Sequence, residues 1–332
     1  MVKESILPEP YRFVFGEVKT NWVVLDGDGE ATYTCDSISV VYEDKKVDLP
    51  SDILVLRERI AKEEFEKALR GERYYWNGPS FCIKKVTIGR RGRNLTLSLL
   101  LGLSDYYTFL ATQMMLDVDI SDIPPDPLKT SNPFGRTLRE RYLVDVDWRK
   151  PNVYLANAFA IGILLVTSDD MAVFTQRSEL VGPRKNYFDC SFSEGFHPIS
   201  DMENGRHNIY RCIARGAFEE MGVRPQYDNI VLLNFGVDTK YYIYAVQGYA
   251  RVDVTSKEFL EYRALRAEDG WEAKQVFLVP FEVKEILKFM YKHGPWASPT
   301  LANIYYVLVN NFGYDKVDSI LKNLPRFYNY RD

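Results

Sequence analysis

A proline-rich segment between residues 120 and 136 most limits how this chain of 332 residues can fold. It contains Ile123-Pro124-Pro125-Asp126-Pro127 and then Ser131-Asn132-Pro133-Phe134-Gly135. Prolines at this density exclude a long helix or a central strand. β-rich runs occur on both sides of the segment, and one domain usually holds about 100–200 residues. The sequence therefore predicts two domains, with a linker or boundary at residues 131–155.

Composition excludes several classes of protein. With 46% hydrophobic and 27% charged residues, the chain is typical of a soluble globular protein and not of a disordered or collagen-like one. The net charge of −4 predicts no attraction of the whole protein to nucleic acid or to anionic lipid. Nucleic acid is therefore not an expected partner.

The cysteines and the apolar stretches bear on localisation. Four scattered cysteines fit a reducing compartment, and the N-terminus lacks the basic head and apolar run of a signal peptide. The most apolar stretch, residues 153–167, is shorter than the roughly 20 residues that span a bilayer. We therefore expect a cytoplasmic protein with no membrane partner. Whether it forms a homodimer stays open.

Residues 1–130 are predicted to form an N-terminal α+β domain of unknown kind. Apolar and β-branched runs favour strands, and Ala61, Phe65 and Leu69 fall at helical spacing. The expected strands are 11–18, 22–25, 37–42 and the hairpin 81–101, and the expected helices are 51–71 and 106–115. No known family resembles this part of the sequence.

After the boundary the pattern changes to a hairpin, a polar loop and alternating strands and helices. The predicted strands are 156–167, 171–177, 187–193, 230–235, 241–250 and 275–280, and the predicted helices are 208–221, 257–267, 283–292 and 299–310. Gly222 follows the helix at 208–221 and suits a left-handed helix cap.

The second half of the helix at 208–221 combines residues that suit a metal site. The segment from Arg215 to Val223 is Arg-Gly-Ala-Phe-Glu-Glu-Met-Gly-Val. At 3.6 residues per turn, the apolar residues cover one face, and Glu219 and Glu220 lie at its edge. Mg²⁺ prefers oxygen ligands and usually takes one or two carboxylates plus substrate phosphates. Arg215, one turn before Glu219, can orient that carboxylate by an i,i+4 ion pair.

This segment resembles the Nudix box, whose core is R-E-U-x-E-E-x-G-U with U a bulky apolar residue. The preceding Ser193-Glu194-Gly195-Phe196 resembles the glycine-bearing turn before the Nudix helix. The resemblance covers about residues 157–290. It implies a Nudix-like α/β/α sandwich with a helical C-terminal tail at residues 156–332, preceded by the separate N-terminal α+β domain.

The resemblance also implies an activity, which is divalent-metal-dependent hydrolysis of a diphosphate bond in a nucleoside diphosphate linked to another group. Glu219 and Glu220 would bind Mg²⁺ or Mn²⁺, and Gly195 would offer its backbone to the metal or phosphate. The ion would neutralise a diphosphate and activate a bound water. The expected partner is a nucleotide or a nucleotide-sugar type of small molecule.

Two positions depart from the family pattern. Gly216 stands where the family has a glutamate that serves as metal ligand or base. The upstream acid position, counted back from Arg215, falls on His207, while Asp201 and Glu203 lie in a loop longer than the family's. A substitute carboxylate is therefore required for hydrolysis.

Glu194 is the preferred substitute, because it replaces a glycine of the family's turn. Asp269 or Glu272 is the other candidate, in a segment that resembles the late loop where several Nudix enzymes keep an additional acid. The predicted catalytic residues are thus Glu220, Glu194 and Glu272.

Alternatives to hydrolysis remain at this stage. Gly216 favours a hydrolysis-deficient module that senses a nucleotide or binds a protein partner. A third carboxylate near Glu219 and Glu220 would favour catalysis, and its absence would favour binding. A zinc site from Cys190, His197, His207 and Cys212 has the spacing of no usual structural zinc pattern. The sequence contains no P-loop, GxSxG, HExxH or GxGxxG motif.

Overall fold

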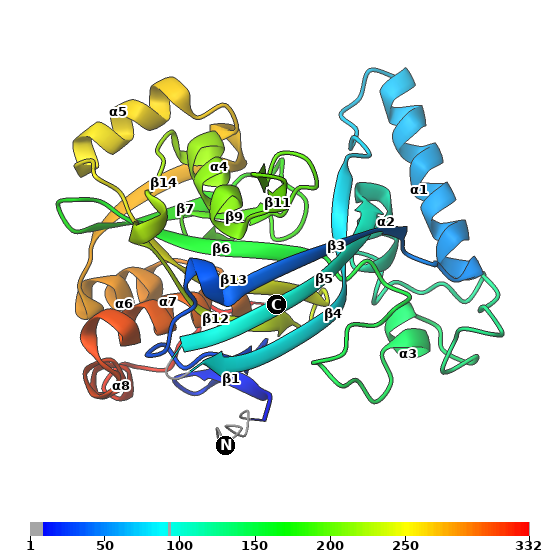
Figure 1. The fold of residues 1–332 in the computed structure, drawn as a ribbon, viewed down its shortest axis with the longest axis horizontal. Coiled ribbons are helices and arrows are strands. Elements are labelled where there is room, and N and C mark those ends of the chain that lie inside the picture. The colour runs from blue at the N-terminus through cyan, green and yellow to red at the C-terminus, as the bar shows by residue number, and fades with distance from the viewer. Residues whose placement is uncertain (1–8, 92–93, 332) are drawn as a thin grey trace.

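The computed structural model describes residues 9–91 and 94–331, and within them the chain is a mixed α+β protein, as predicted (Figure 1). Its strands are β1 (Tyr11–Phe15), β2 (Val18–Asp26), β3 (Ile38–Lys46), β4 (Pro79–Arg91), β5 (Asn94–Asp105), β6 (Phe159–Val166), β7 (Met171–Arg177), β8 (Phe188–Asp189), β9 (Phe192–Gly195), β10 (Met202–Glu203), β11 (Arg206–His207), β12 (Ile230–Asp238), β13 (Ile243–Arg251) and β14 (Ala273–Pro280). Its α-helices are α1 (Ser51–Leu69), α2 (Tyr106–Thr112), α3 (Leu138–Tyr142), α4 (Ile209–Met221), α5 (Ser256–Arg266), α6 (Val283–Lys292), α7 (Ser298–Phe312) and α8 (Tyr314–Lys322). Of the helices in the described ranges, none has the length and apolarity needed to cross a membrane.

The large sheet has the strand order β1-β2-β12-β13-β6-β7-β14, with β13 and β6 parallel and the neighbouring pairs antiparallel. Strands β6 and β7 pair only at Leu165 and Val166, at one end. Further along, β9 pairs with β6 and β8 pairs with β7. The two short strands therefore lie where β6 and β7 separate. They replace the single strand predicted at 187–193.

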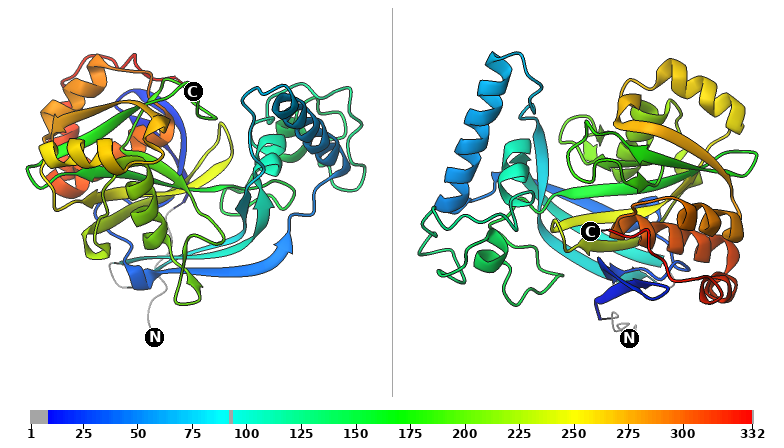
Figure 2. Two further views of the ribbon diagram at one scale, coloured as in Figure 1. Left: turned by 90° about the horizontal axis from the view of Figure 1, so that it is seen from above. Right: turned by 180° about the vertical axis from the view of Figure 1, so that it is seen from behind.

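Helices cover both faces of the large sheet (Figure 2). Helices α4 and α5 lie over one face, and α6, α7 and α8 lie over the other. Strand β6 shows the expected period of two, because Ile161 and Ile163 pack with α4 while Leu164 and Val166 pack with α7. The large sheet thus lies between two layers of helices.

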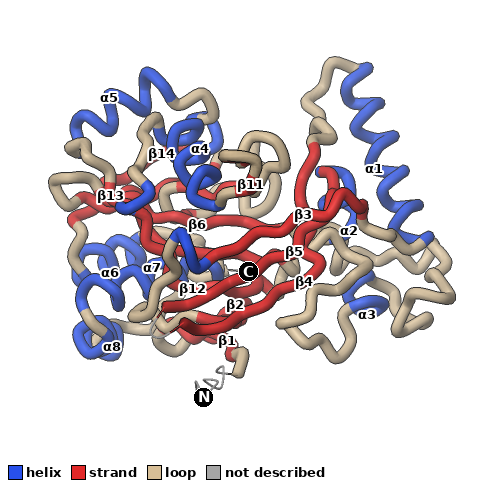
Figure 3. Tube along the Cα trace, viewed as in Figure 1, coloured by secondary structure: helices blue, strands red, loops and turns tan. Residues whose placement is uncertain are grey.

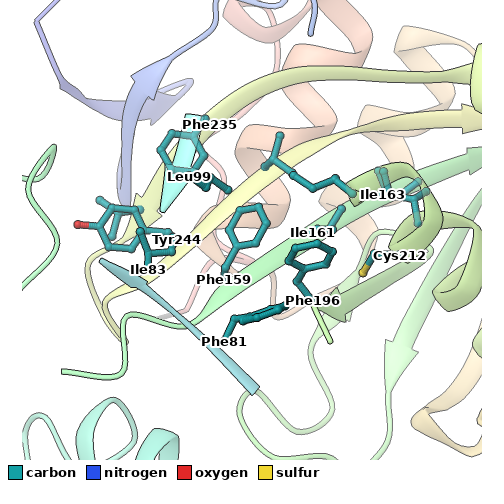
Figure 4. Close-up of a cluster of buried hydrophobic side chains, with 14 of the residues drawn as sticks. Phe81, Ile83, Leu99, Phe159, Ile161, Ile163, Phe196, Cys212, Phe235 and Tyr244 are labelled. Carbon is teal, nitrogen blue, oxygen red and sulfur yellow. The ribbon is translucent and has the colours of Figure 1, made fainter. Parts of the chain in front are cut away.

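The second sheet, with the order β3-β5-β4, shares the core on the α4 side of the large sheet (Figure 3). Phe81 and Leu99 of this sheet lie in one cluster with Phe159 and Ile161 of β6 (Figure 4). The two parts of the chain are therefore packed on each other through apolar side chains.

The boundary expected at residues 131–155 does not coincide with a division between sheets. Strand β2 belongs to the N-terminal part, yet it pairs with β12 in the large sheet. Its alternating side chains enter both cores, with Val23 on the α4 side and Trp22 on the α7 side. Strands β1 and β2 form a hairpin at the edge of the large sheet and bury their apolar side chains against it. The N-terminal residues 11–26 therefore complete the C-terminal sheet.

The proline-rich segment is a fixed loop. Arg141, only 2% exposed, donates through Nη1 to Asp52 Oδ2 of α1 at 2.9 Å. Its other donors bind backbone carbonyl oxygens of residues 120, 123 and 135. The hydroxyl of Tyr142 donates to the second oxygen of Asp52 at 2.7 Å. Residues 120–142 are thereby tied to the first turn of α1.

Helix α4 begins and ends where its sequence predicts. The Asn208 side chain accepts a hydrogen bond from the backbone N–H of Tyr210, and Gly222 adopts φ 72° at the C-terminal cap. Position 222 also requires glycine for close packing, because an added Cβ would lie 2.5 Å from the carbonyl oxygen of Tyr262 in α5. The two helices are therefore in close contact at the end of the Glu219–Glu220 segment.

Candidate functional site

The candidate site lies between strand β9 and helix α4. Glu194, the third residue of β9, extends toward α4 and lies against Gly216. A Cβ built on Gly216 would be 3.0 Å from the Cβ, Cγ and Oε2 atoms of Glu194. Glu194 therefore fills the space beside the helix position where the resembled family has a glutamate. A larger residue at 216 would displace this carboxylate.

Arg215 joins three carboxylates. It binds Asp201 with two hydrogen bonds, from Nε to Oδ1 at 2.8 Å and from Nη2 to Oδ2 at 2.9 Å. Its Nη1 lies 2.8 Å from Glu219 Oε2 and 3.3 Å from Glu194 Oε2. The i,i+4 pair with Glu219 is thus formed, and one guanidinium brings residues from β9, the following loop and α4 together.

Asp201 is the acid that pairs with Arg215, and counting back along the sequence missed it. That count gave His207, whose Nε2 instead lies 2.9 Å from the carbonyl oxygen of Pro198. Asp201 is fully buried and also accepts a hydrogen bond from the backbone N–H of His197 at 2.7 Å.

A small hairpin explains the difference between the two positions. Strands β10 and β11 pair with each other, and Asn204 and Gly205 form the turn between them with φ 50° and 74°. The backbone N–H of Asn208 then bonds the carbonyl oxygen of Asp201 at 2.9 Å, so the loop returns to its starting point. The Asn-Gly pair, a strong signal for a tight hairpin turn, could have revealed that the longer loop folds as a hairpin.

Burial and like charges raise the pKa values of Glu194 and Glu220. Burial raises the pKa of Glu194 to about 7, against the lowering effect of Arg215, and Glu219 adds to the rise. Burial also raises the pKa of Glu220 well above its ordinary value, and the charges of Glu272 and Glu194 add to it. Carboxyl groups near each other in a protein interior resist ionisation, so these groups favour the protonated form in the absence of a cation.

The loop that contains Asp269 and Glu272 adds a further carboxyl group to the cluster around α4. The backbone N–H of Asp269 donates to the carbonyl oxygen of Glu219 at 2.9 Å, which docks the loop on the end of α4. Burial raises the pKa of Glu272, while the charge of Arg177 lowers it. The Asp269 carboxylate instead accepts a hydrogen bond from the indole N–H of Trp271. Of the two acids predicted in this loop, Glu272 is the one that interacts with Glu220.

Arg215 also contacts the backbone of the turn that follows Glu194. The carbonyl oxygen of Gly195 accepts a hydrogen bond from Arg215 Nη2 at 3.1 Å. Across residues 9–91 and 94–331, no group of three or more His, Cys, Asp or Glu side chains has the geometry of a metal site. The donor set itself is chemically suited to Mg²⁺, since it consists of carboxylate oxygens.

Comparisons with known proteins leave the family open. No family model and no curated protein matches the chain. Among solved structures, the protein DR0079 from Deinococcus radiodurans is similar over 44% of this chain and 75% of its own. The sequence identity is 12% and the TM-score is 0.27. At these values the likeness establishes neither a family nor an activity.

The structure separates the residues of the zinc alternative. Cys190 belongs to the core on the α7 side of the large sheet, and Cys212 belongs to the core on the α4 side. Burial raises the pKa of both thiols well above the ordinary value, which disfavours the thiolate that zinc requires. These cysteines are core residues.

Proposed function

We propose that this protein is a Nudix-like divalent-metal-dependent hydrolase of a diphosphate bond in a nucleoside diphosphate linked to another group. The observation that supports this most is the position of Glu194 against Gly216. It supplies a carboxylate from β9 at the helix position where the family's glutamate is missing. Under this proposal, Glu194 of the neighbouring strand takes the role of the glutamate that Gly216 replaces.

Glu219, Glu220 and Glu194 are the residues that would hold a divalent cation. When bound, such an ion supplies Lewis-acid chemistry and neutralises the charge of the diphosphate. The gathering of several carboxyl groups around one guanidinium supports uptake of a cation, which would displace the protons that the raised pKa values of Glu194 and Glu220 favour. Arg215 contacts Glu219 through Oε2, so Glu219 would bind the cation through Oε1, and Glu194 would turn away from Arg215.

The other residues have supporting roles in this proposal. Asp201 fixes Arg215 through two hydrogen bonds, and Arg215 in turn positions Glu219. Glu194 would either complete the ligands of the cation or act as the general base, a role that suits a carboxyl group whose pKa burial raises to about 7. Glu272 is the second acid of the site, on the side of Glu220.

Calorimetric titration of Mg²⁺ and Mn²⁺ tests the proposal. The wild type and a Glu219→Gln/Glu220→Gln variant are compared, each with a panel of non-hydrolysable nucleoside diphosphate analogues. We expect metal binding in the wild type and none in the variant. A matched control is Glu63→Gln/Glu64→Gln, which removes adjacent glutamates from the distant helix α1 (Figure 1). Equal metal binding in the wild type and the Glu219/Glu220 variant would contradict the assignment.

Hydrolysis is measured next, on a panel of nucleoside diphosphate conjugates with Mg²⁺ present. Glu220→Gln should lower the rate by about two orders of magnitude or more, since removal of one preorganised electrostatic group typically costs that much. Unchanged turnover in this variant would exclude Glu220 from the reaction.

One observation favours a second function, a nucleotide-sensing or protein-binding module without hydrolysis. Arg215 contacts Glu194, Glu219 and the carbonyl oxygen of Gly195, so it occupies the position among the oxygen ligands that a cation would take. Under this alternative, the nucleoside diphosphate analogues bind with the same affinity with and without Mg²⁺. The same titration therefore separates the two functions.

A further inference from the structure

A pocket of about 190 Å³ lies on the other face of the large sheet, at the N-terminal turn of α7. It is lined by Trp22 of β2, Gln247 of β13 and Asn303 of α7, and by Arg177 and Ser193 near the point where β6 and β7 separate. The pocket thus begins next to the carboxylate site, because Ser193 precedes Glu194 in β9. The side chains of the two residues point to opposite faces of the sheet.

Four of the side chains that line this pocket have polar atoms without a hydrogen-bond partner in the described part of the chain. They are the donors Trp22 Nε1 and Arg177 Nε and the acceptors Gln247 Oε1 and Asn303 Oδ1. Trp22, Gln247 and Asn303 are at most 2% exposed. Buried polar groups are nearly always paired in folded proteins, so a cluster of unpaired ones around a pocket points to a ligand.

The orientation of the two amides is fixed by their other ends. Gln247 Nε2 donates to the carbonyl oxygen of Pro299 at 2.9 Å, and Asn303 Nδ2 donates to that of Gly162 at 3.2 Å. Each side chain is thereby held with its oxygen atom unpaired and buried, so a ligand reaches this oxygen by shifting a neighbouring side chain. A ligand here must offer hydrogen-bond donors to these oxygens and acceptors to Trp22 and Arg177.

The charges of the pocket are already balanced by ion pairs. Arg177 lies 3.5 Å from Asp189, and Arg184 pairs with Asp238 at 2.5 Å. The group that fits is therefore neutral and polar. Ile243 and Ala245 contribute apolar walls to the pocket, so the flat faces of a bound group would make apolar contacts there. A volume below the roughly 300–1,000 Å³ of pockets for drug-sized ligands suits one ring system rather than a whole nucleotide.

We infer that this pocket binds the heterocyclic base of a nucleoside. Gln247 and Asn303 accept hydrogen bonds from the base, and Trp22 and Arg177 donate hydrogen bonds to it. Arg177 is the link to the catalytic side, because its charge acts on Glu220 and Glu272. A diphosphate attached to the nucleoside would pass Arg177 to reach the carboxylates. The statement that the base belongs to the substrate rests on the proposed function.

The experiment uses nucleosides without phosphate and without added metal, so it tests the pocket alone. Adenosine, guanosine, cytidine and uridine are each titrated into the full chain by calorimetry. We expect at least one to bind the wild type. Gln247→Met should weaken that binding about tenfold or more, since it removes one hydrogen bond to the ligand and leaves a ligand donor unpaired. Trp22→Phe, which keeps an aromatic ring and removes the N–H, should weaken it as well.

Asn234→Leu is the matched control. Asn234 of β12 is fully buried and both polar atoms of its amide lack a partner within the described residues, but it is not among the residues that line the pocket. Its replacement should leave nucleoside affinity within about twofold of the wild type. Thermal unfolding of each variant shows that the native fold is kept.

Two results would overturn the inference. One is that none of the four nucleosides binds the wild type at millimolar concentration. The other is that the nucleoside binds Gln247→Met and Trp22→Phe as tightly as the wild type. Failure of the proposed hydrolysis is a separate result. If the protein binds a nucleoside through Gln247 but hydrolyses no diphosphate conjugate, the inference about the pocket stands and the proposed hydrolysis is wrong.

Discussion

Arg141 and Arg215 are two largely buried arginines that each hold a loop against a helix, and the charges around them differ. Arg141 contacts one carboxylate, that of Asp52, and its other N–H groups donate to backbone carbonyl oxygens. Arg215 contacts the carboxylates of Asp201, Glu194 and Glu219. The first arginine is neutralised by one partner, whereas the second has more negative charge around it than it can balance.

This difference separates a structural ion pair from a candidate site. A balanced buried pair holds two segments of the chain together and leaves no charge to be compensated. Around α4 two further carboxyl groups, those of Glu220 and Glu272, add to the three around Arg215, and Arg177 and Arg263 oppose them. Like charges in a protein interior destabilise the fold unless a proton or a cation binds. The excess is therefore the reason to test this cluster for ligand binding.

The largest effect is expected from breaking the balanced pair. Arg141→Met should lower the free energy of unfolding by about 3–5 kcal/mol, because it leaves Asp52 buried with only Tyr142 as a side-chain partner. Urea denaturation followed by circular dichroism measures this change. Arg136→Met is the control, since Arg136 is exposed and its pair with Asp119 should contribute at most about 1 kcal/mol. A loss below about 1 kcal/mol in Arg141→Met would remove the basis of the comparison.

The second prediction exchanges the carboxylate between β9 and α4. Glu194→Gly removes a proposed ligand, and Gly216→Glu forces a second carboxylate into space that Glu194 fills at 3.0 Å. Each single variant should lower the hydrolysis rate by about two orders of magnitude. The double variant Glu194→Gly/Gly216→Glu returns the carboxylate to the helix position that the family uses. We expect its rate within about tenfold of the wild type.

Mn²⁺ affinity, measured by calorimetry on the same three variants, gives a readout that does not depend on finding the substrate. It should follow the same order, with the double variant above both single ones. If the double variant binds metal no better than either single variant, Glu194 does not replace the missing glutamate.

The third prediction concerns pH. The pKa of Glu194 rises from an ordinary value of 4.5 to about 7 on folding, so the fold favours the protonated carboxyl group. Its contribution to stability is therefore fully present below about pH 4.5 and is lost as the pH rises through about 7. The metal-free protein should lose about 3 kcal/mol of unfolding free energy over this range.

Denaturation at a series of pH values checks this slope in the wild type and in Glu194→Gln, which carries no ionisable group at this position. The variant should show a flatter dependence. Metal affinity should change in the opposite direction and increase with pH, because cations bind the deprotonated carboxylates. Identical pH profiles for the two proteins would show that Glu194 does not titrate in this range.

Much of helix α4 could be predicted from the sequence, because its signals are local. Asn208 and Gly222 mark its ends, and the apolar period places Glu219 and Glu220 at the edge of its buried face. Most other helices of the C-terminal half and its hairpin β6–β7 follow from the same kind of local pattern. The residue types of the Arg215 segment also pointed to the right helix for a cluster of acids.

Contacts between distant segments could not be predicted in this way. The pairing of β2 with β12 joins residues more than 200 positions apart, and no local pattern encodes it. The partner of Arg215 was missed because a hairpin moves Asp201 six positions away from the expected place. The pocket near α7 includes Gln247, and the face of the sheet to which this side chain belongs is known only when the neighbours of β13 are known.

The smallest effect is expected in that hairpin. Gly205 has φ 74° with no atom within 4 Å of an added Cβ, so Gly205→Ala costs only backbone strain, about 1 kcal/mol. Asp201 itself is held by Arg215 and by the backbone N–H of His197, which the substitution does not touch. Thermal denaturation should therefore show the loss of stability while Mn²⁺ affinity changes by less than about twofold. A drop of tenfold or more in that affinity would mean that the hairpin, and not Arg215, positions the acid, and the unbalanced cluster would then extend beyond the residues around α4.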